Sequence, residues 1–243
     1  MTPLSDFQRM PATRAAFTLV ELLSVIAIIG VLAAIIIPTV SHVRSAARDT
    51  VGLSNLRQIG LAASLYANEH HNCYPYSYKA GEYDFALVLA AYIAPGAAQY
   101  GDGMAGSEIF HDPAATFSIG RLHYSAHPVL MPDFANNGPQ FNRSRLIRPG
   151  ETVLVADGAQ PLSGDVHASF WAIDAGRAWT SFTGSAADDQ PINPGPDTDA
   201  DSSAGNVRFR AAGDTACKVV FTDGHVRMLK KDQFLRRYIR LEP

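Results

Sequence analysis

The chain has 243 residues, a formal net charge of −3 and a sequence pI near 6.2. This length suits one globular domain with an appendage rather than two full hydrophobic cores. The chain carries no net basic charge, so its totals argue against a nucleic-acid-binding protein that relies on long-range attraction.

The first element is an apolar run over residues 17–37 (FTLVELLSVIAIIGVLAAIII). A hydrocarbon core of about 30 Å needs about 20 residues of helix, so the run is long enough to span a membrane. A secretory signal peptide has a shorter apolar region with small residues after it, whereas here two alanines precede the run. An uncleaved signal anchor is the simplest interpretation. Basic residues flank both ends, so the positive-inside rule does not orient the segment.

Beyond Pro38, apolar residues recur at three- to five-residue steps from Val43 to Tyr66, with charged residues between them. This pattern is typical of an amphipathic helix. Because no loop signal separates it from the apolar run, we predict one helix over about residues 17–70, which at ~1.5 Å per residue is about 80 Å long. One small domain cannot bury such a helix, so its first half must contact lipid or other helices.

After this helix, the sequence predicts a small antiparallel sheet with few helices. Residues 85–93 form a short predicted helix that ends before Pro95 and Gly96. Residues 152–156 (TVLVA) and 218–221 (KVVF) are predicted strands, and residues 226–229 continue after an Asp-Gly turn. Residues 183–205 are the longest predicted loop. The expected fold class is α+β, because a parallel sheet would need alternating helices.

The segment RAAFTLVELL (residues 14–23) closely resembles the N-terminus of type IV pilins and type II secretion pseudopilins. The resemblance implies that a prepilin peptidase cuts between Ala16 and Phe17 and that the new amine of Phe17 is methylated. It also implies that the subunit is first held in membrane lipid. An inner-membrane assembly platform then adds it to a helical filament made of copies of the same subunit. The family usually has Gly before the cut, and this chain has another small residue, Ala16.

Glu21 is the acidic residue of the apolar run. An ionisable side chain at bilayer depth costs about 2.5–3.5 kcal/mol, so Glu21 requires a partner. The resemblance implies that this partner is the Phe17 amine of a neighbouring subunit. An unpaired buried charge is strongly unfavourable even where the pair adds little stability, so we expect Glu21 to select the register of assembly. The alternative is a carboxyl group that is protonated, or that reaches the headgroups from near the helix end.

The remainder resembles a bacterial subgroup of pilin-like proteins, in which segments similar to RPGETVLVADG (residues 148–158) and KVVFTDGHVRML (residues 218–229) occur in this order. The chain departs from that subgroup at two places. Gly213 stands where a His usually lies ten residues before the Asp of the second Asp-Gly, and His111-Asp112-Pro113 stands where Cys-Pro is common.

The resulting domain assignment is a leader over residues 1–16, a transmembrane and assembly helix over 17–38, its amphipathic continuation over 39–72, and a globular domain over 73–243. The resemblance implies a single-pass protein of the inner (cytoplasmic) membrane with its globular domain in the periplasm, or a subunit of a periplasmic or extracellular filament.

Cys73 and Cys217 are the two cysteines of the chain. In an oxidising compartment, a disulfide between them would join the end of the long helix to a late strand. Two unpaired buried thiols are the open alternative.

Asp197, Asp199 and Asp201 alternate in PDTDADSS, and carboxylates in such a loop are suitable Ca²⁺ ligands. An EF-hand is excluded, because Ser202 replaces the required Gly and Arg208 replaces the bidentate Glu. Major pseudopilins hold calcium in a C-terminal loop, so the resemblance allows a Ca²⁺ site here. A solvated acidic loop is the alternative.

The eight histidines do not form a zinc-ligand pattern, and the sequence has neither a Gly-x-Ser-x-Gly elbow nor a Gly-rich phosphate loop after a strand. We therefore expect no enzymatic activity. The expected function is a pseudopilin filament subunit in type II secretion-type protein export. The alternatives are a type IV pilus subunit and a singly membrane-anchored envelope protein with a ligand-binding ectodomain.

Overall fold

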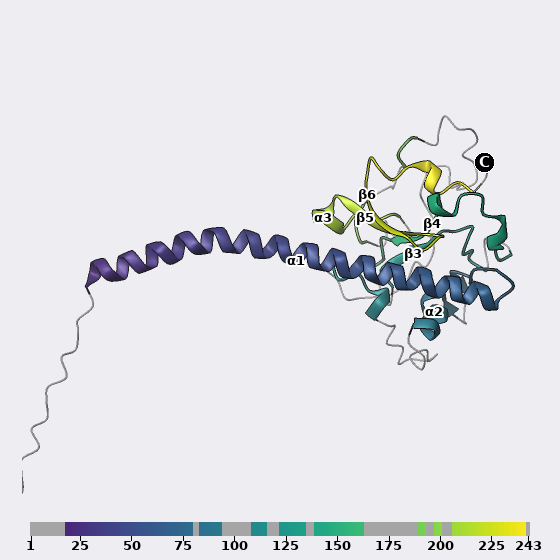
Figure 1. Cartoon of the computed structure of the whole chain (residues 1–243), viewed down its shortest axis with the longest axis horizontal. Helices are drawn as coiled ribbons and strands as arrows, with labels where there is room; N and C mark the ends of the chain where they lie inside the picture. The colour runs from purple at the N-terminus through teal and green to yellow at the C-terminus, as the bar shows by residue number, and fades with distance from the viewer. Residues whose placement is uncertain are drawn as a thin grey trace, which may run out of the picture. The chain divides into compact units, whose positions relative to one another are not determined.

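The computed structural model describes residues 18–79, 83–93, 108–115, 122–134, 139–162, 189–192, 197–200 and 206–241. The chain divides into two compact units, Met1–Val43 and Arg44–Pro243. The long helix α1 (Leu19–Glu69) contributes to both units (Figure 1). Its bounds confirm the predicted helix to within two residues at the N-terminal end and one at the C-terminal end.

The first half of α1 is long and apolar enough to cross a membrane, judged by length and composition alone. Pro38 lies inside the helix without ending it. Near this proline, the hydroxyl of Thr39 donates to the carbonyl of Ile35 at 2.8 Å. The helix therefore continues through Pro38.

The second unit is built on an antiparallel sheet of four strands in the order β3-β4-β5-β6. Their bounds are β3 (Tyr124–Ala126), β4 (Val153–Asp157), β5 (Ala216–Phe221) and β6 (Val226–Lys230). The α+β fold class is confirmed, with β4, β5 and β6 at the predicted places. The short strand β3 was not predicted from the sequence.

Smaller elements complete this unit. A two-stranded ladder of β1 (Tyr78–Lys79) and β2 (Tyr83–Asp84) leads into helix α2 (Phe85–Ile93), which has the predicted bounds. A four-residue helix α3 (Ala211–Asp214) precedes β5. Single 3₁₀ turns are η1 (Glu108–Phe110), η2 (Arg143–Arg145), η3 (Pro149–Glu151) and η6 (Arg236–Tyr238).

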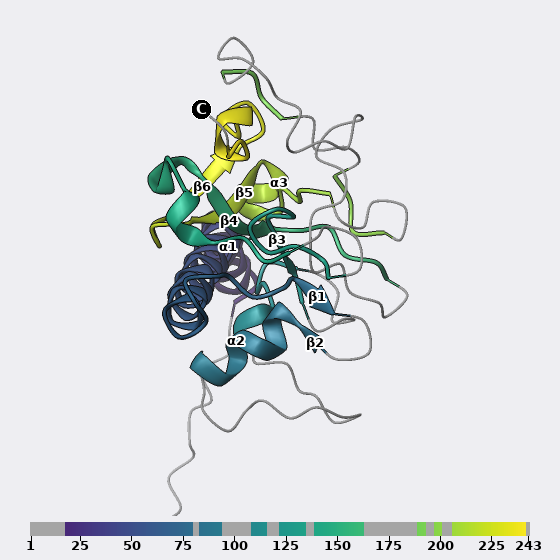
Figure 2. The same ribbon diagram turned by 90° about the vertical axis from the view of Figure 1, so that its right-hand side faces the viewer.

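The second half of α1 packs on the sheet, as Figure 2 shows. Leu56 and Ile59 are fully buried in a core cluster that also contains Val155 and Val220 of the strands. A second cluster includes Val153 and Phe221, together with residues of the C-terminal segment. A register shift in the pairing of β4 with β5 lies between Val153 and Val155, so these two residues join different clusters.

Of the two alternatives for the cysteines, the structure shows free thiols, with Cys73 partly exposed and Cys217 buried. Cys73 lies outside the four-stranded sheet, in an isolated β-bridge with Asn142. Cys73 precedes Tyr74, whose hydroxyl donates to the carbonyl of Thr222, just beyond the end of β5. Cys217 lies near the start of β5, about 16 Å along the strand from Thr222 at ~3.3 Å per residue.

Candidate functional site

Glu21 lies in the first turn of α1 and exchanges hydrogen bonds with Thr18. The backbone N–H and the hydroxyl of Thr18 donate to Glu21 Oε2 at 2.9 and 2.8 Å, and the Glu21 N–H donates to Thr18 Oγ1 at 3.2 Å. This reciprocal arrangement is a capping box, which satisfies amides left open at a helix start. Glu21 therefore stabilises the beginning of its own helix, a role that the Thr-x-x-Glu spacing signalled and that our sequence analysis missed.

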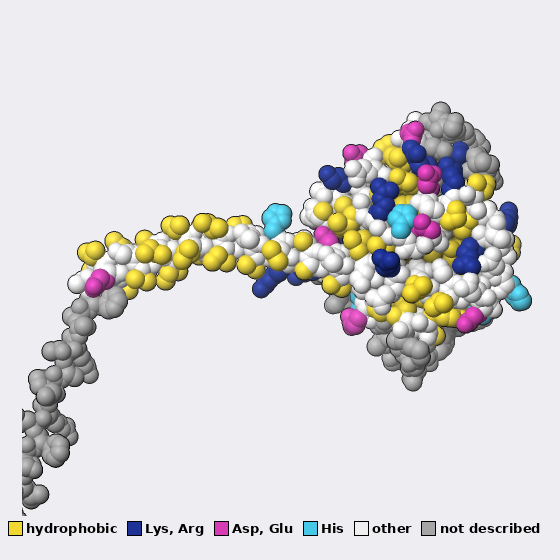
Figure 3. All heavy atoms as spheres, in the orientation of Figure 1, with side chains coloured by type: hydrophobic (Ala, Val, Ile, Leu, Met, Phe, Trp, Pro, Cys, Tyr) yellow, Lys and Arg dark blue, Asp and Glu magenta, His cyan; other side chains and the backbone are white. Residues whose placement is uncertain are grey.

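The helix that starts at this cap is apolar on all sides. Every Leu, Ile and Val from Leu19 to Ile37 is exposed, from 46% at Val25 to 79% at Leu19. In Figure 3, hydrophobic side chains cover this stretch of the helix. A helix that is apolar all round requires lipid or partner helices. Ala16 and Phe17, the predicted cleavage site, lie outside the described residues.

The hydroxyl groups in this stretch bond to the helix itself. Ser24 Oγ donates to the carbonyl of Val20 at 2.8 Å, as Thr39 does to Ile35. In a hydrocarbon environment a polar group must be satisfied internally, because no water is available. These side chains are therefore compatible with a helix that crosses lipid.

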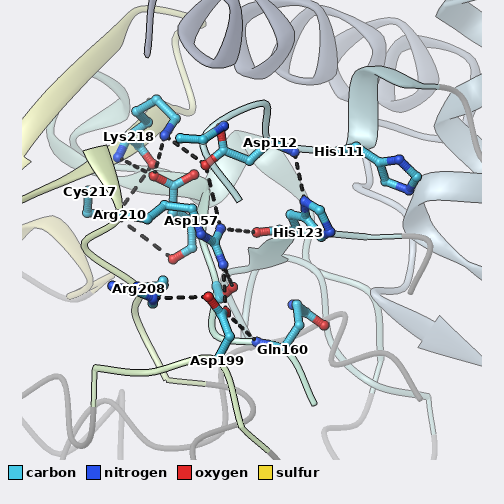
Figure 4. Close-up of polar contacts among 12 residues, drawn as sticks. His111, Asp112, His123, Asp157, Gln160, Asp199, Arg208, Arg210, Cys217 and Lys218 are labelled. Carbon is cyan, nitrogen blue, oxygen red and sulfur yellow. Dashed lines mark hydrogen bonds and ion pairs between the residues drawn. The ribbon is translucent and has the colours of Figure 1, made fainter. Parts of the chain in front are cut away.

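The second unit contains a buried ion cluster, which we define as Asp112, Asp157, Arg210 and Lys218 (Figure 4). Lys218 Nζ lies 2.9 Å from Asp112 Oδ2 and 3.0 Å from Asp157 Oδ2. The side chains of all three residues are fully buried. Burying charges is costly unless they are paired, and here one ammonium faces two carboxylates.

Three separate elements bring these groups together. Asp157 ends β4 and Lys218 is the third residue of β5, while Asp112 follows η1. The backbone N–H of Lys218 donates to Asp157 Oδ2 at 2.8 Å, which fixes the carboxylate beside the strand. Helix α1 closes over the lysine at Gly52, where a Cβ would lie 2.5 Å from Lys218 Cε.

Arg210 connects the cluster to the acidic loop. Its Nη1 lies 3.6 Å from Asp112 Oδ2 and donates to the carbonyl of His123 at 3.1 Å. Its Nη2 donates to the carbonyl of Gly158 at 3.0 Å and to Asp199 Oδ1 at 2.8 Å. Asp157-Gly158 is the first Asp-Gly pair in the segments that resemble the bacterial subgroup. The Asp157 side chain contacts Lys218, and the Gly158 carbonyl accepts a hydrogen bond from Arg210.

Two of the three predicted Ca²⁺ ligands, Asp197 and Asp199, contact cationic side chains of the same chain. Asp197 Oδ1 accepts from Arg208 and from the Phe209 N–H, and its Oδ2 lies 2.7 Å from Lys231 Nζ. Asp199 accepts from both Arg208 and Arg210. Their oxygens therefore already have cationic or N–H donors, and Asp201 lies outside the described residues. Within the described part of the chain, no group of three or more His, Cys, Asp or Glu residues could hold a metal ion.

Burial sets the electrostatics of the cluster. It raises the pKa of Asp157 to about 6, against the opposing effect of Lys218. For Lys218, burial favours a lower pKa, but the carboxylates of Asp157 and Asp112 outweigh it and the pKa is raised. Burial and the charge of Arg210 lower the pKa of His123 to about 4. The cluster therefore places an amine, an acid able to carry a proton, and a second carboxylate in direct contact.

The thiol beside this cluster has little nucleophilic character. Cys217 is fully buried, and burial followed by the charge of Asp157 raises the pKa of its thiol well above the usual value. A reactive cysteine requires the thiolate form. The cluster is therefore not a cysteine-based catalytic site.

No protein family, no curated protein sequence and no solved structure matches this chain. A long N-terminal helix, apolar in its first half and packed on an antiparallel sheet in its second, is compatible with a pilin-like architecture.

Proposed function

We propose that the chain is a pilin-like filament subunit, a pseudopilin of a type II secretion-type export system. A prepilin peptidase cuts its precursor between Ala16 and Phe17, and the subunit polymerises through the first half of α1. The observation that carries this proposal is the exposed apolar stretch of α1, together with the carboxylate of Glu21 in its first turn. Membrane lipid covers this surface before assembly, and the helices of neighbouring subunits cover it afterwards.

Glu21 has two roles in this proposal. Both hydrogen bonds that Thr18 donates to the carboxylate use Oε2, so the cap does not need Oε1. The second oxygen is then available to the methylated Phe17 amine of a neighbouring subunit. Because leaving either charge unpaired in lipid is strongly unfavourable, the pair selects one axial register.

The capping box provides the matched variants that separate these roles. Glu21→Gln keeps a side chain that can complete a capping box but removes the charge. Thr18→Ala removes the cap and keeps the charge, and Glu21→Ala removes both. We expect both Glu21 variants to insert into the membrane and fail to form filaments, while Thr18→Ala still assembles. Electron microscopy of sheared filaments and cross-linking of intact cells measure this. Normal assembly by Glu21→Gln would refute the charge-pairing role and leave Glu21 as a cap alone.

Processing is tested separately by mass spectrometry of the membrane-extracted protein. The expected chain begins at N-methylated Phe17. A retained Met1, or a cut elsewhere without a methyl group on Phe17, contradicts the proposal. A singly anchored envelope protein, the alternative, would also tolerate Glu21→Ala without any loss of higher-order structure. A type IV pilus subunit shares the expected processing. Whether the assembled filament supports protein export distinguishes a pseudopilin from a pilus subunit.

A further inference from the structure

The contact between Lys218 and Asp112 holds an amine nitrogen directly beside a carboxyl group. The amine nitrogen lies 2.9 Å from Asp112 Oδ2, and neither side chain has exposed surface. Reacting groups that are held together in a fixed orientation can reach effective molarities of about 10⁵–10⁸ M. An amine and a carboxyl held in this way can condense to an amide.

We propose that Lys218 and Asp112 form an intramolecular isopeptide bond, with Asp157 as the proton carrier. The Lys218 ammonium first gives a proton through Asp157 to Asp112 Oδ2, which leaves a neutral amine. The amine attacks Asp112 Cγ and forms the C–N bond. A second proton passes from the nitrogen through Asp157 to Oδ2, the C–O bond breaks, and water leaves. Asp157 ends in its starting state, and the step needs no oxidant or reductant.

The contacts of the two carboxylates assign their roles. Asp112 Oδ1 accepts the N–H of Ala114 at 3.1 Å, so this oxygen has a donor when negative charge develops on it. Asp112 Oδ2, the oxygen nearer Lys218, leaves as water. The positive charge of Arg210, 3.6 Å from Oδ2, favours the same carboxyl as the electrophile.

Asp157 suits the carrier role for two reasons. Its Oδ2 accepts the backbone N–H of Lys218 at 2.8 Å, so the carboxylate stays in place while protons move. Its raised pKa, about 6, is closer to neutral pH than that of an ordinary carboxyl, which makes proton acceptance and release efficient. The two carboxylates raise the pKa of Lys218, so its proton must move before the amine can attack.

The surroundings of the two side chains favour condensation, and the charges that remain after it are paired. Gly52 allows α1 to close on the lysine, and the reacting side chains are dry. Excluding water strengthens the local electrostatics and disfavours the reverse hydrolysis. After the bond forms, Arg210 remains with Asp157 and Asp199 as counter-charges. The bond would join residues 106 positions apart in the sequence.

The test is intact mass spectrometry of the full-length chain, extracted in detergent, incubated at neutral pH and then denatured. The expected mass is lower than that of the same chain without a cross-link by one water molecule. Protease digestion should release a branched peptide that contains Asp112 and Lys218. An unmodified mass after prolonged incubation would overturn the proposal, whether or not any variant folds.

Matched variants test the roles of the individual groups. Asp112→Asn should form the same bond with loss of ammonia instead of water from the variant chain, because an amide nitrogen is the leaving group. Lys218→Met and Asp112→Ala should show no mass loss. Asp157→Asn should fold with the unmodified mass, as measured by circular dichroism and mass spectrometry of the same sample. A cross-linked Asp157→Asn protein would refute the carrier role, and a branched peptide at other residues would refute the assigned bond.

Discussion

The contact of Gly60 in α1 with Val220 in β5 allows a quantitative test of how the helix packs on the sheet. A Cβ at position 60 would lie 2.6 Å from Val220 Cγ2. Because carbon atoms prefer separations of about 3.5–4.0 Å, Gly60→Ala requires a local shift of about 1 Å. Ile59 and Val220 are fully buried, so this shift disturbs a packed core.

The expected magnitude is the difference between two opposing effects. Inserting a methyl group into a packed core costs about 1–3 kcal/mol. Replacing Gly by Ala inside a helix contributes about 1 kcal/mol of stability. The net expectation for Gly60→Ala is a loss of up to about 2 kcal/mol, and in a domain of this size each 1 kcal/mol lowers Tm by about 2–4 °C.

Thermal unfolding of the detergent-solubilised protein, followed by circular dichroism, measures this loss. Gly30→Ala is the control, because a Cβ there meets nothing within 4 Å and should not lower the Tm of the globular unit. The double variant Gly60→Ala/Val220→Ala should lose about 1 kcal/mol less unfolding free energy than the sum of the two single losses. The reason is that the methyl group added at position 60 occupies the space vacated at position 220. If the effects of Gly60→Ala and Val220→Ala simply add in the double variant, the inferred contact is refuted.

Three further predictions concern the globular unit. Burial lowers the pKa of His127 to about 4, so between about pH 4 and 6.5 the unfolded state binds more protons. The free energy of unfolding, measured by urea titration at a series of pH values, should therefore fall as the pH decreases through this window. His127→Gln should make this free energy less dependent on pH. Maleimide should label the partly exposed Cys73 in the folded protein and the buried Cys217 only after denaturation, as counted by mass spectrometry. Gly158→Ala should prevent folding, because a Cβ there would overlap the side chain of Ser125, and Ser125→Gly should partly restore soluble yield.

Elements with a strong local signal were predictable from the sequence. Helix α1 has a long run of apolar periodicity, and α2 is bounded by a proline and a glycine that end helices. Strands β4 and β5 contain β-branched residues in short runs, and β5 is joined to β6 by a turn at Asp223-Gly224, where Gly224 has φ 90°. Strand β3 has only three residues and is defined by its pairing with β4, so no local pattern marked it.

The buried ion cluster depends on contacts between distant residues, which single-sequence patterns do not contain. Lys218 is separated from Asp112 by 106 residues and from Asp157 by 61 residues. In the sequence, Lys218 was only the polar first residue of a predicted strand. The partners of the acidic loop were missed for a related reason. Arg208 was counted as a missing metal ligand, whereas in the structure it is the counter-ion of Asp197 and Asp199.

The glycines of α1 separate its two halves by what each half contacts. At Gly52 and Gly60, an added Cβ would collide with side chains of β5, so the sheet of the same chain explains these residues. At Gly30, an added Cβ would meet nothing within 4 Å, and the apolar residues around it are exposed. Burying an apolar side chain of the size of Val, Leu or Ile contributes about 1.5–3 kcal/mol, which the globular unit gains from the second half of the helix. On the proposed function, the first half gains this contribution from lipid or from other chains, so residues 19–43 would supply the free energy for the proposed assembly.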